Sequence, residues 1–143
     1  MNVAAILKSK GRDVVTTTPE MSLLDVAKLL EQQGIGCIVI AGDDGKVAGI
    51  VSERDIVRAV GRSGAKVLKE PVATYMTRTV ITAREADTID RVMSEMTAHH
   101  FRHMPVVERG RLIGLVSIGD VVKMRIAEAE MEAAAMREYI TTG

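Results

Sequence analysis

The segment GIVSERD at residues 49–55 recurs in altered form as GLVSIGD at residues 114–120, and this repetition decides how the rest of the chain is interpreted. Each copy is a short apolar run that ends in Ser-x-x-Asp, where a segment of helical character begins. Ser and Asp at such a junction can cap a helix, while backbone N–H groups of its first turn stay available to an anion. Two copies therefore predict a duplicated unit with a duplicated site.

Both copies lie within the same series of predicted elements. In the first, β-branched residues 14–18 favour an extended segment, and apolar residues at helical spacing continue from the capping residue Ser22 as far as Gly34. Strands at 37–41 and 47–51 flank a glycine-rich turn, and a helix then runs from about Glu53 to Val60. The second copy repeats this order without a gap up to the turn; Val80, Ile89, Val92, Met96 and Phe101 correspond to Val14, Leu23, Val26, Leu30 and Ile35. A tandem duplication of a β-α-β-β-α unit is predicted.

Composition excludes several classes of function. Nineteen basic and nineteen acidic residues cancel, so the net charge does not favour nucleic acid or an anionic membrane as a partner. One Phe, two Tyr and no Trp leave almost no aromatic surface on which bases could stack. The single cysteine, Cys37, excludes an intramolecular disulfide, and neither a signal-peptide pattern nor an apolar run of membrane-spanning length is present. A soluble, cytoplasmic protein is expected.

The size of the units predicts how they associate. A unit of about 50 residues rarely folds alone, so the two are expected to pack face to face with pseudo-twofold symmetry and to form ligand clefts between them. The fold class is therefore α/β (α+β), with two tandem repeats and a C-terminal helix. We expect a first repeat with an N-terminal helix at residues 1–60, a linker at 61–71, a second repeat at 72–125 and a helical tail at 126–143.

The tail is rich in Ala, Glu, Met and Arg, which favour a helix. Its apolar residues follow the alternating spacing of a coiled-coil seam: Val122, Ile126, Ala129, Ala133, Met136 and Ile140. Because such a short seam is insecure alone, two interpretations stay open: a helix that lies on its own chain, or a helix at a dimer contact.

Taken together, the paired units, with G-h-S-x-x-D at the end of each, resemble a tandem CBS-domain pair, the regulatory module of the cystathionine-β-synthase type. The resemblance extends from Val14 to Arg125, and the segments VSERDIVRAV and FRHMPVVERGRLIGLVSIGDVV are especially similar to small stand-alone CBS-pair proteins. It implies a Bateman module that binds an adenosine ligand, with AMP first and ADP, ATP, NAD(H) or S-adenosylmethionine as alternatives. It also implies a homodimer and an unknown regulated protein as partner.

The resemblance further implies which residues form the sites. The Asp of each copy would accept hydrogen bonds from ribose hydroxyls, with its Ser beside it, that is Asp55 with Ser52 and Asp120 with Ser117. Threonines of the entering strands would face the clefts, namely Thr16 and Thr18 in the first unit and Thr82 in the second.

The adenine pocket would be lined by two corresponding segments. These are Ile35, Gly36, Cys37 and Ile38 in the first unit and Phe101, Arg102, His103, Met104 and Pro105 in the second. Cationic donors form charge-assisted bonds with phosphate, so Arg54, Arg102 and His103 are the candidates for phosphate contacts. The clefts need not bind equally, because Ile118-Gly119 replaces Glu53-Arg54, and the first unit has Val39 where the second has Pro105.

Simpler interpretations accompany each of these hypotheses. Both Asp residues can serve only as helix caps, and Cys37 can be a packed, unreactive side chain. His99 and His100 are expected to point apart on a helix, so no metal site is predicted from them and His103. No nucleophile with a paired base, catalytic carboxylate pair or metal-ligand set can be assembled from the sequence, so no enzymatic activity is expected.

Three functions are consistent with these features of the sequence. The leading hypothesis is a non-catalytic sensor that binds an adenine nucleotide between the repeats and signals to a partner. The alternatives are a structural dimerisation module with vestigial clefts and a redox-linked regulator of a partner enzyme that depends on Cys37.

Overall fold

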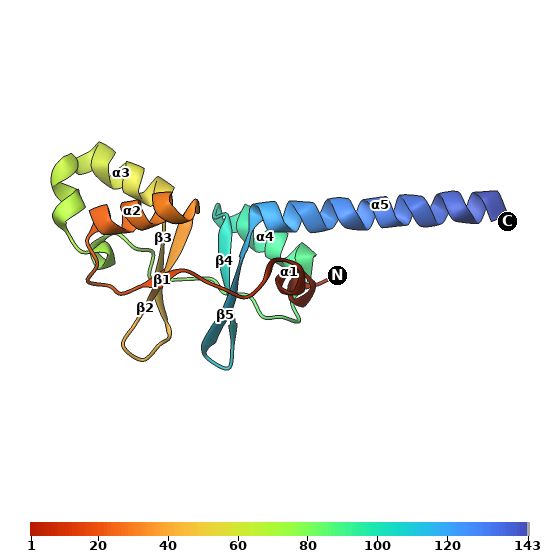
Figure 1. Ribbon diagram of the computed structural model, residues 1–143, viewed down its shortest axis with the longest axis horizontal. Helices are drawn as coiled ribbons and strands as arrows, with labels where there is room; N and C mark the ends of the chain where they lie inside the picture. The colour runs from red at the N-terminus through yellow and green to blue at the C-terminus, as the bar shows by residue number, and fades with distance from the viewer. Residues whose placement is uncertain (143) are drawn as a thin grey trace.

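The computed structural model describes residues 1–142, which form two halves with a similar order of helices and strands. The first half contains β1 (Thr16–Thr17), α2 (Leu23–Gln33), β2 (Cys37–Ala41), β3 (Val47–Ser52) and α3 (Glu53–Ser63). The second contains α4 (Ile89–His99), β4 (His103–Glu108), β5 (Arg111–Ser117) and α5 (Ile118–Thr142). A short helix, α1 (Val3–Lys10), precedes both halves, and the two hairpins point the same way in Figure 1.

The strand pairing confirms the predicted duplication. In the first half β1 runs parallel to β2, with Thr17 opposite Ile40, and β2 pairs antiparallel with β3. In the second half β4 pairs antiparallel with β5, and a parallel bridge joins Ala83 to Val106 at the position that corresponds to the Thr17–Ile40 pair. Both halves therefore follow the β-α-β-β-α order expected from the sequence.

Local capping explains where the helices begin and end. Ser22 and Thr88 accept hydrogen bonds from backbone N–H groups in the first turns of α2 and α4. These helices end at corresponding residues, Gly34 and His100, which both adopt the left-handed conformation with φ of 63° and 58°. A left-handed residue ends a helix because it turns the chain away while the last carbonyl groups keep partners.

Two apolar cores show that the halves exchange their leading segments. Val3, Ile6 and Leu7 of α1 belong to the core of the second half. Val67, Val72 and Met76, which lead into the second half, belong to the core of the first. The expected boundaries grouped the N-terminal helix with the first repeat, whereas its buried side chains lie with the second.

The recurring glycines in the two copies allow this exchange. A Cβ atom at Gly49 would lie 2.5 Å from the Sδ atom of Met76, and one at Gly114 would lie 2.6 Å from a Cδ atom of Leu7. Contacts of this length are shorter than packed atoms tolerate. Glycine therefore lets the leading segment of one half cross the β-hairpin of the other.

The segment expected as a linker is more ordered than its composition indicated. Helix α3 continues to Ser63, and two short 3₁₀ helices follow at Ala65–Lys69 and Val72–Thr74. Val67 is fully buried, so its packing against the first half outweighs the flexibility of the flanking glycines.

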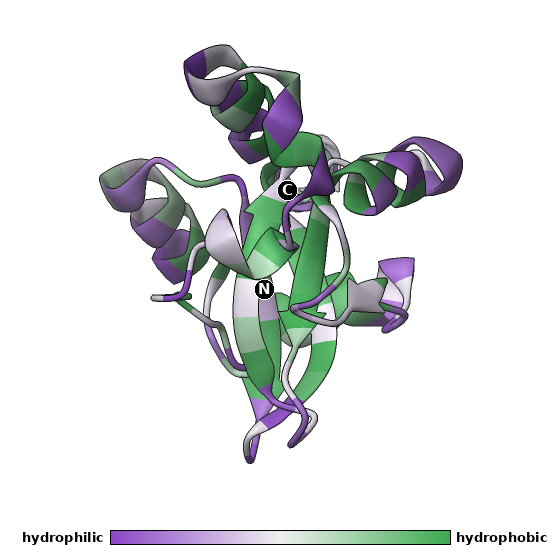
Figure 2. Ribbon diagram, turned by 90° about the vertical axis from the view of Figure 1, so that its left-hand side faces the viewer, coloured by the Kyte–Doolittle hydropathy of each residue, from purple (hydrophilic) through white to green (hydrophobic). Residues whose placement is uncertain are grey.

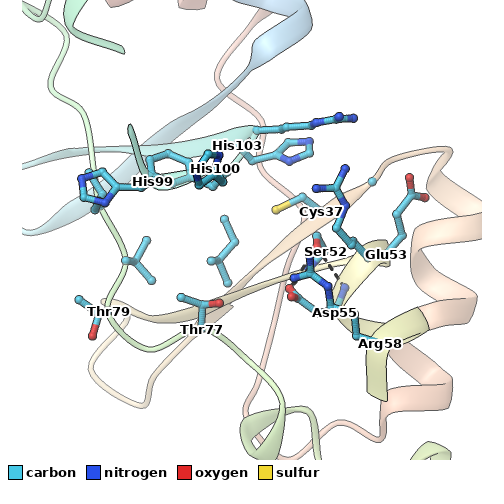
Figure 3. Close-up of a pocket in the computed structure, with 17 residues that line it drawn as sticks. Cys37, Ser52, Glu53, Asp55, Arg58, Thr77, Thr79, His99, His100 and His103 are labelled. Carbon is cyan, nitrogen blue, oxygen red and sulfur yellow. Dashed lines mark hydrogen bonds between the residues drawn. The ribbon is translucent and has the colours of Figure 1, made fainter. Parts of the chain in front are cut away.

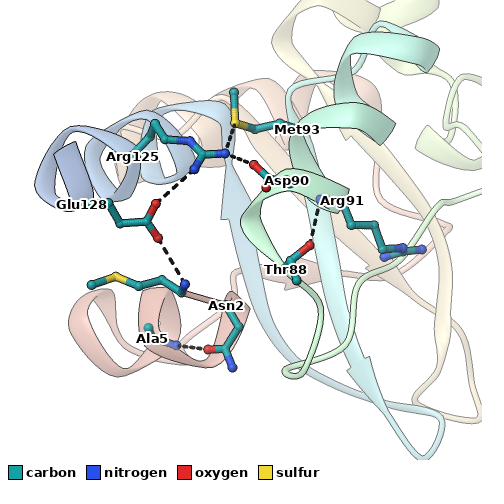
Figure 4. A network of polar contacts seen from close by, with 9 residues as sticks. Asn2, Ala5, Thr88, Asp90, Arg91, Met93, Arg125 and Glu128 are labelled. Atoms are coloured by element: carbon teal, nitrogen blue, oxygen red, sulfur yellow. Dashed lines mark hydrogen bonds and ion pairs between the residues drawn. The ribbon is translucent and has the colours of Figure 1, made fainter. Parts of the chain in front are cut away.

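Polar contacts attach the start of α5 to the second half (Figure 4). Arg125 pairs with Asp90 of α4 and, at 3.1 Å, with Glu128 of its own helix. The amino group of Met1 lies 3.2 Å from the other oxygen of Glu128. Beyond this network α5 extends away from the rest of the chain, and every residue from 129 to 142 is exposed.

Hydropathy follows the layers of the fold. In Figure 2 the strands are hydrophobic over most of their length, and hydrophilic residues concentrate on the helices and at the hairpin tips. The strands form the interior of both halves, so polar side chains that can hold a ligand lie where strands meet helices.

Candidate functional site

Both Ser-x-x-Asp copies form reciprocal capping boxes. Asp55 Oδ2 accepts the backbone N–H of Ser52 at 2.8 Å, and Ser52 Oγ accepts the backbone N–H of Asp55 at 3.3 Å. Asp120 and Ser117 repeat these two bonds at 2.8 Å and 3.2 Å. These bonds use only the Oδ2 oxygen of each carboxylate. Capping is therefore compatible with a ligand contact through Oδ1.

A pocket of about 550 Å³ opens above the first of these boxes. It lies between the two halves and is bordered by four segments. They are Gly36 and Cys37; Ile50 with Ser52, Glu53, Arg54, Asp55 and Arg58; Thr77 with Thr79, Val80 and Ile81; and His99 to His103. Figure 3 shows the histidines on one side of the pocket and Asp55 and Arg58 on the other, with Thr77 and Thr79 along a third side. A cavity of this size accommodates a nucleotide-sized ligand.

The charges around the pocket favour an anion. Arg54 and Arg58 extend from successive turns of α3, and Arg102 lies on the opposite segment. Glu53 and Asp55 are the carboxylates of the same lining. Three guanidinium groups against two carboxylates leave an excess of positive charge that can hold a phosphate group, while Asp55 can accept bonds from hydroxyls.

His103 lies at the junction of the two halves. A Cβ atom built on Gly36 would lie 3.8 Å from its imidazole carbon Cε1 and 3.6 Å from an oxygen of Glu53. Burial lowers the pKa of His103, and the positive charge of Lys10 acts in the same direction. The imidazole is therefore held neutral near pH 7, when it can both donate and accept a hydrogen bond.

Cys37 borders the pocket from the start of β2, with a side chain that is only 2% exposed. Burial, together with the negative charge of Asp55, raises the pKa of its thiol to about 12. A thiol with this pKa is almost wholly protonated at neutral pH, whereas reactive cysteines have lowered pKa values. The geometry favours a packing role.

The structure brings about half of the sequence-predicted site residues together. Those that border the pocket are Gly36, Cys37, Ser52, Arg54, Asp55, Phe101, Arg102 and His103. All three candidates for phosphate contacts are among them.

The remaining candidates lie elsewhere. Ile38 and Met104 are buried in the cores, and Pro105 is buried beside Met104 in β4. Ile35 borders a shallow depression between α2 and α3. The entering-strand threonines Thr16, Thr18 and Thr82 do not border the pocket. Ser117 and Asp120 form the second capping box, on the other side of the interface, where Asp120 pairs with Lys10 at 2.7 Å.

Several pocket residues were missed in the sequence. Residues 77–81 reach the pocket because the leading segment of the second half crosses β3, where Thr77 and Ile50 exchange backbone hydrogen bonds of 2.9 Å and 3.0 Å. No local sequence pattern predicts that crossing. Arg58 could have been found, because it lies four residues after Arg54 and so shares its helix face. His99 and His100 border the pocket despite the expectation that they point apart, since His100 leaves the helix in the left-handed conformation.

Residues 1–142 contain no group of three or more His, Cys, Asp or Glu side chains arranged to hold a metal ion. Within the same residues, no helix combines the length and apolar character needed to cross a bilayer.

Comparison with known proteins identifies the same duplication. The CBS domain family matches residues 6–62 and 72–126. A CBS-domain-containing protein from Agrobacterium tumefaciens has a similar solved structure, with 46% sequence identity and a TM-score of 0.84 over 87% of this chain and 92% of that one.

Two further similar structures contain adenosine compounds. The CBS domain pair of protein MJ0100, in complex with 5′-methylthioadenosine and S-adenosyl-L-methionine, is 27% identical with a TM-score of 0.79, over 90% of this chain and 98% of that one. A CBS domain protein from Pyrobaculum aerophilum, complexed with AMP, is 28% identical with a TM-score of 0.75, over 84% of this chain and 89% of that one.

Proposed function

The chain belongs to the CBS-domain family, and from this premise we propose that it is a non-catalytic regulatory module that binds an adenine nucleotide, with AMP as the first candidate, in the pocket beside Asp55. The observation that carries the proposal is the pocket itself, which combines an available carboxylate oxygen with a cationic wall in a nucleotide-sized cavity. Solved relatives in complex with AMP and with S-adenosyl-L-methionine support an adenosine ligand.

Each part of a nucleotide has matching chemistry in the lining. Asp55 can accept hydrogen bonds from the ribose hydroxyls through Oδ1 while Oδ2 continues to cap α3. Arg54, Arg58 and Arg102 can donate charge-assisted bonds to the phosphate. The apolar part of the lining, chiefly Ile50, Val80, Ile81 and Phe101, suits a purine ring.

We place the regulation in an assembly of two copies in the cytoplasm that signals to a further protein. Because the pocket combines segments from both halves, a nucleotide there favours one relative arrangement of the halves over others. A partner protein that contacts both halves can then distinguish the bound form from the free one.

A thermal-shift panel tests the ligand. AMP, ADP, ATP, NADH and S-adenosylmethionine are each added to the full chain, and a ligand at about 100 times its Kd raises the free energy of unfolding by about 2.7 kcal/mol. AMP is expected to give the largest shift. No shift with any of the five would refute the proposal.

Two variants with matched controls locate the site. Asp55→Asn keeps an acceptor for the Ser52 N–H but removes the charge, and Asp43→Ala removes an exposed carboxylate from the β2–β3 turn. Arg58→Ala removes a cation from the pocket, and Arg62→Ala removes one from the next turn of α3, outside the lining. We expect the affinity for the nucleotide, obtained from the thermal shift, to fall at least about tenfold in the two pocket variants and to stay unchanged in their controls.

The alternative function is a structural dimerisation module with vestigial clefts. The observation in its favour is the projecting, exposed α5, which suits assembly independently of any ligand. It predicts that the pocket variants and their controls melt alike in the presence of every nucleotide.

A further inference from the structure

The two capping boxes differ in what else contacts their carboxylates. Asp55 has no ion pair within residues 1–142, and its second hydrogen bond to Oδ2 comes from Ser52 Oγ at 3.1 Å. Asp120 Oδ2 instead accepts from the ammonium group of Lys10 at 2.7 Å. The chain thus supplies a cation to one of two otherwise equivalent carboxylates.

In the second cleft, Lys10 also makes the contact that a backbone N–H makes in the first cleft. There, the carbonyl oxygen of Ile50 accepts the N–H of Thr77 at 2.9 Å from the crossing segment. The corresponding carbonyl oxygen, that of Leu115, accepts from the Lys10 Nζ atom at 2.8 Å. In the second half, the ammonium group therefore takes the position that corresponds to the crossing backbone beside the first pocket. A carboxylate and a carbonyl together hold it there.

The position of Lys10 is fixed by the fold. It is the last residue of α1, whose Leu7 packs against the β5 glycine Gly114 and accepts the N–H of Gly11 at 2.8 Å. The side chains of Lys10 and Asp120 are 36% and 19% exposed, so solvent screens the pair only in part. Two hydrogen bonds and an anchored helix end hold the ammonium group beside Asp120.

We propose that Lys10 is an internal counter-ion that holds the cleft beside Asp120 closed to nucleotide, so that only the cleft beside Asp55 is open. The inference rests on the proposed nucleotide-binding function and adds that the two clefts are filled unequally. A ribose that approaches Asp120 competes with the Lys10 ammonium for the carboxylate and leaves the Leu115 carbonyl without its donor. Displacing a half-exposed, charge-assisted bond of this kind weakens ligand binding by roughly tenfold, between the values typical of an exposed ion pair and of a buried hydrogen bond to a charge.

Titration calorimetry with AMP on the full chain tests this inference. The wild type is expected to bind one AMP per chain, and Lys10→Met to bind two, because Met keeps the aliphatic stem but removes the charge. Lys10→Gln also removes the charge but retains a donor for the Leu115 carbonyl. It serves as the second test variant if Lys10→Met does not fold. Lys8→Met is the matched control, since Lys8 is exposed in the same helix turn, and it is expected to match the wild type.

A second substitution separates this inference from the proposed function. The added site of Lys10→Met should vanish with Asp120→Asn and persist with Asp55→Asn. If Lys10→Met binds AMP no better than Lys8→Met, or more weakly, Lys10 is not a competitor of the ligand and the inference is overturned. Binding by Lys10→Met without binding by the wild type would instead uphold the inference and refute the open cleft at Asp55.

Discussion

A carboxylate has two oxygen atoms, so the cap at Asp55 leaves room for the ligand contact proposed above. Oδ2 accepts both bonds from Ser52, the residue that precedes α3, and neither bond uses Oδ1. The two interpretations of Ser-x-x-Asp, a helix cap and a ligand contact, are thus compatible at this residue. At Asp120 the same cap is present, and Lys10 adds an ion pair. Burial alone would raise the pKa of Asp120, but hydrogen bonds from Lys10 and Ser117 outweigh it and hold the pKa below its ordinary value.

At the same scale, Cys37 is expected to react slowly in the folded protein. Its raised pKa of about 12 leaves very little thiolate at pH 8, whereas the unfolded chain, with an ordinary pKa near 9.0, has about a tenth of its thiol ionised. Iodoacetamide labelling followed by mass spectrometry should therefore be at least about 100-fold slower in buffer than in urea.

The same shift sets a pH dependence. Between pH 9 and 12 the unfolded thiol loses its proton while the folded one keeps it, so the free energy of unfolding falls as pH rises through this range. Cys37→Ala should flatten that part of the curve in urea titrations. Rapid labelling of the folded chain at pH 8 would contradict the packing role and revive the redox-linked hypothesis.

At the scale of elements, α5 differs from the other helices because it has no partner over most of its length. The sequence left open whether the tail lies on its own chain, and the exposure of residues 129–142 contradicts that interpretation. Met136 and Ile140 of the predicted seam are 63% and 73% exposed. Apolar side chains at coiled-coil spacing bury little surface unless a second helix covers them, which favours the dimer-contact interpretation.

Truncation after Arg125 tests that interpretation. Removal of residues 126–143 deletes an exposed helix and the Glu128 contacts but leaves both cores intact, so the melting temperature should change by only a few degrees. Light scattering is expected to show a monomer. The double variant Ile126→Glu, Met136→Glu should also be monomeric, while Glu130→Gln, which lies off the seam, should stay dimeric. A truncated chain that still dimerises would exclude α5 as the contact.

At the scale of the whole molecule, exchange of the leading segments makes the two halves interdependent. Helix α1 completes the second core and residues 67–76 complete the first, so neither half retains a full core without the other's leading segment. The same crossing brings residues 77–81 to the pocket beside Asp55. The same arrangement of the chain therefore completes both cores and forms the pocket, and unfolding should be a single cooperative transition.

Alanine at the crossing glycines should destabilise this arrangement. Gly49→Ala and Gly114→Ala place a methyl group against Met76 and Leu7, and overpacking of this kind costs about 1–3 kcal/mol. Urea unfolding monitored by circular dichroism measures the loss. Gly61→Ala is the matched control, because a Cβ atom there meets nothing within 4 Å and the residue lies in α3, where alanine is favoured by up to about 1 kcal/mol. Equal stability of the control and the crossing variants would contradict the close packing.

Most of the elements could be predicted from the sequence because their signals are local. The caps at Ser22 and Ser52, the hairpin turns and the apolar spacing each act within a few residues, and they predicted the duplicated unit and its strands. Of the two Ser-x-x-Asp copies, the first borders the pocket proposed as the site, and the second does not. The linker was less predictable, because the burial of Val67 depends on the first core and not on its neighbours in sequence.

The sequence by itself determined the duplication, the element order and the residues at the two strand ends. Tertiary structure alone decided which residues meet there: Thr77 to Ile81 beside Asp55, and Lys10 beside Asp120. The physical reason is the range of the interactions. Caps and periodicity act along a few residues of chain, whereas the crossing of a leading segment depends on packing between segments far apart in sequence, such as Leu7 against Gly114. Two carboxylates with equivalent places in the sequence therefore have different partners in the folded protein.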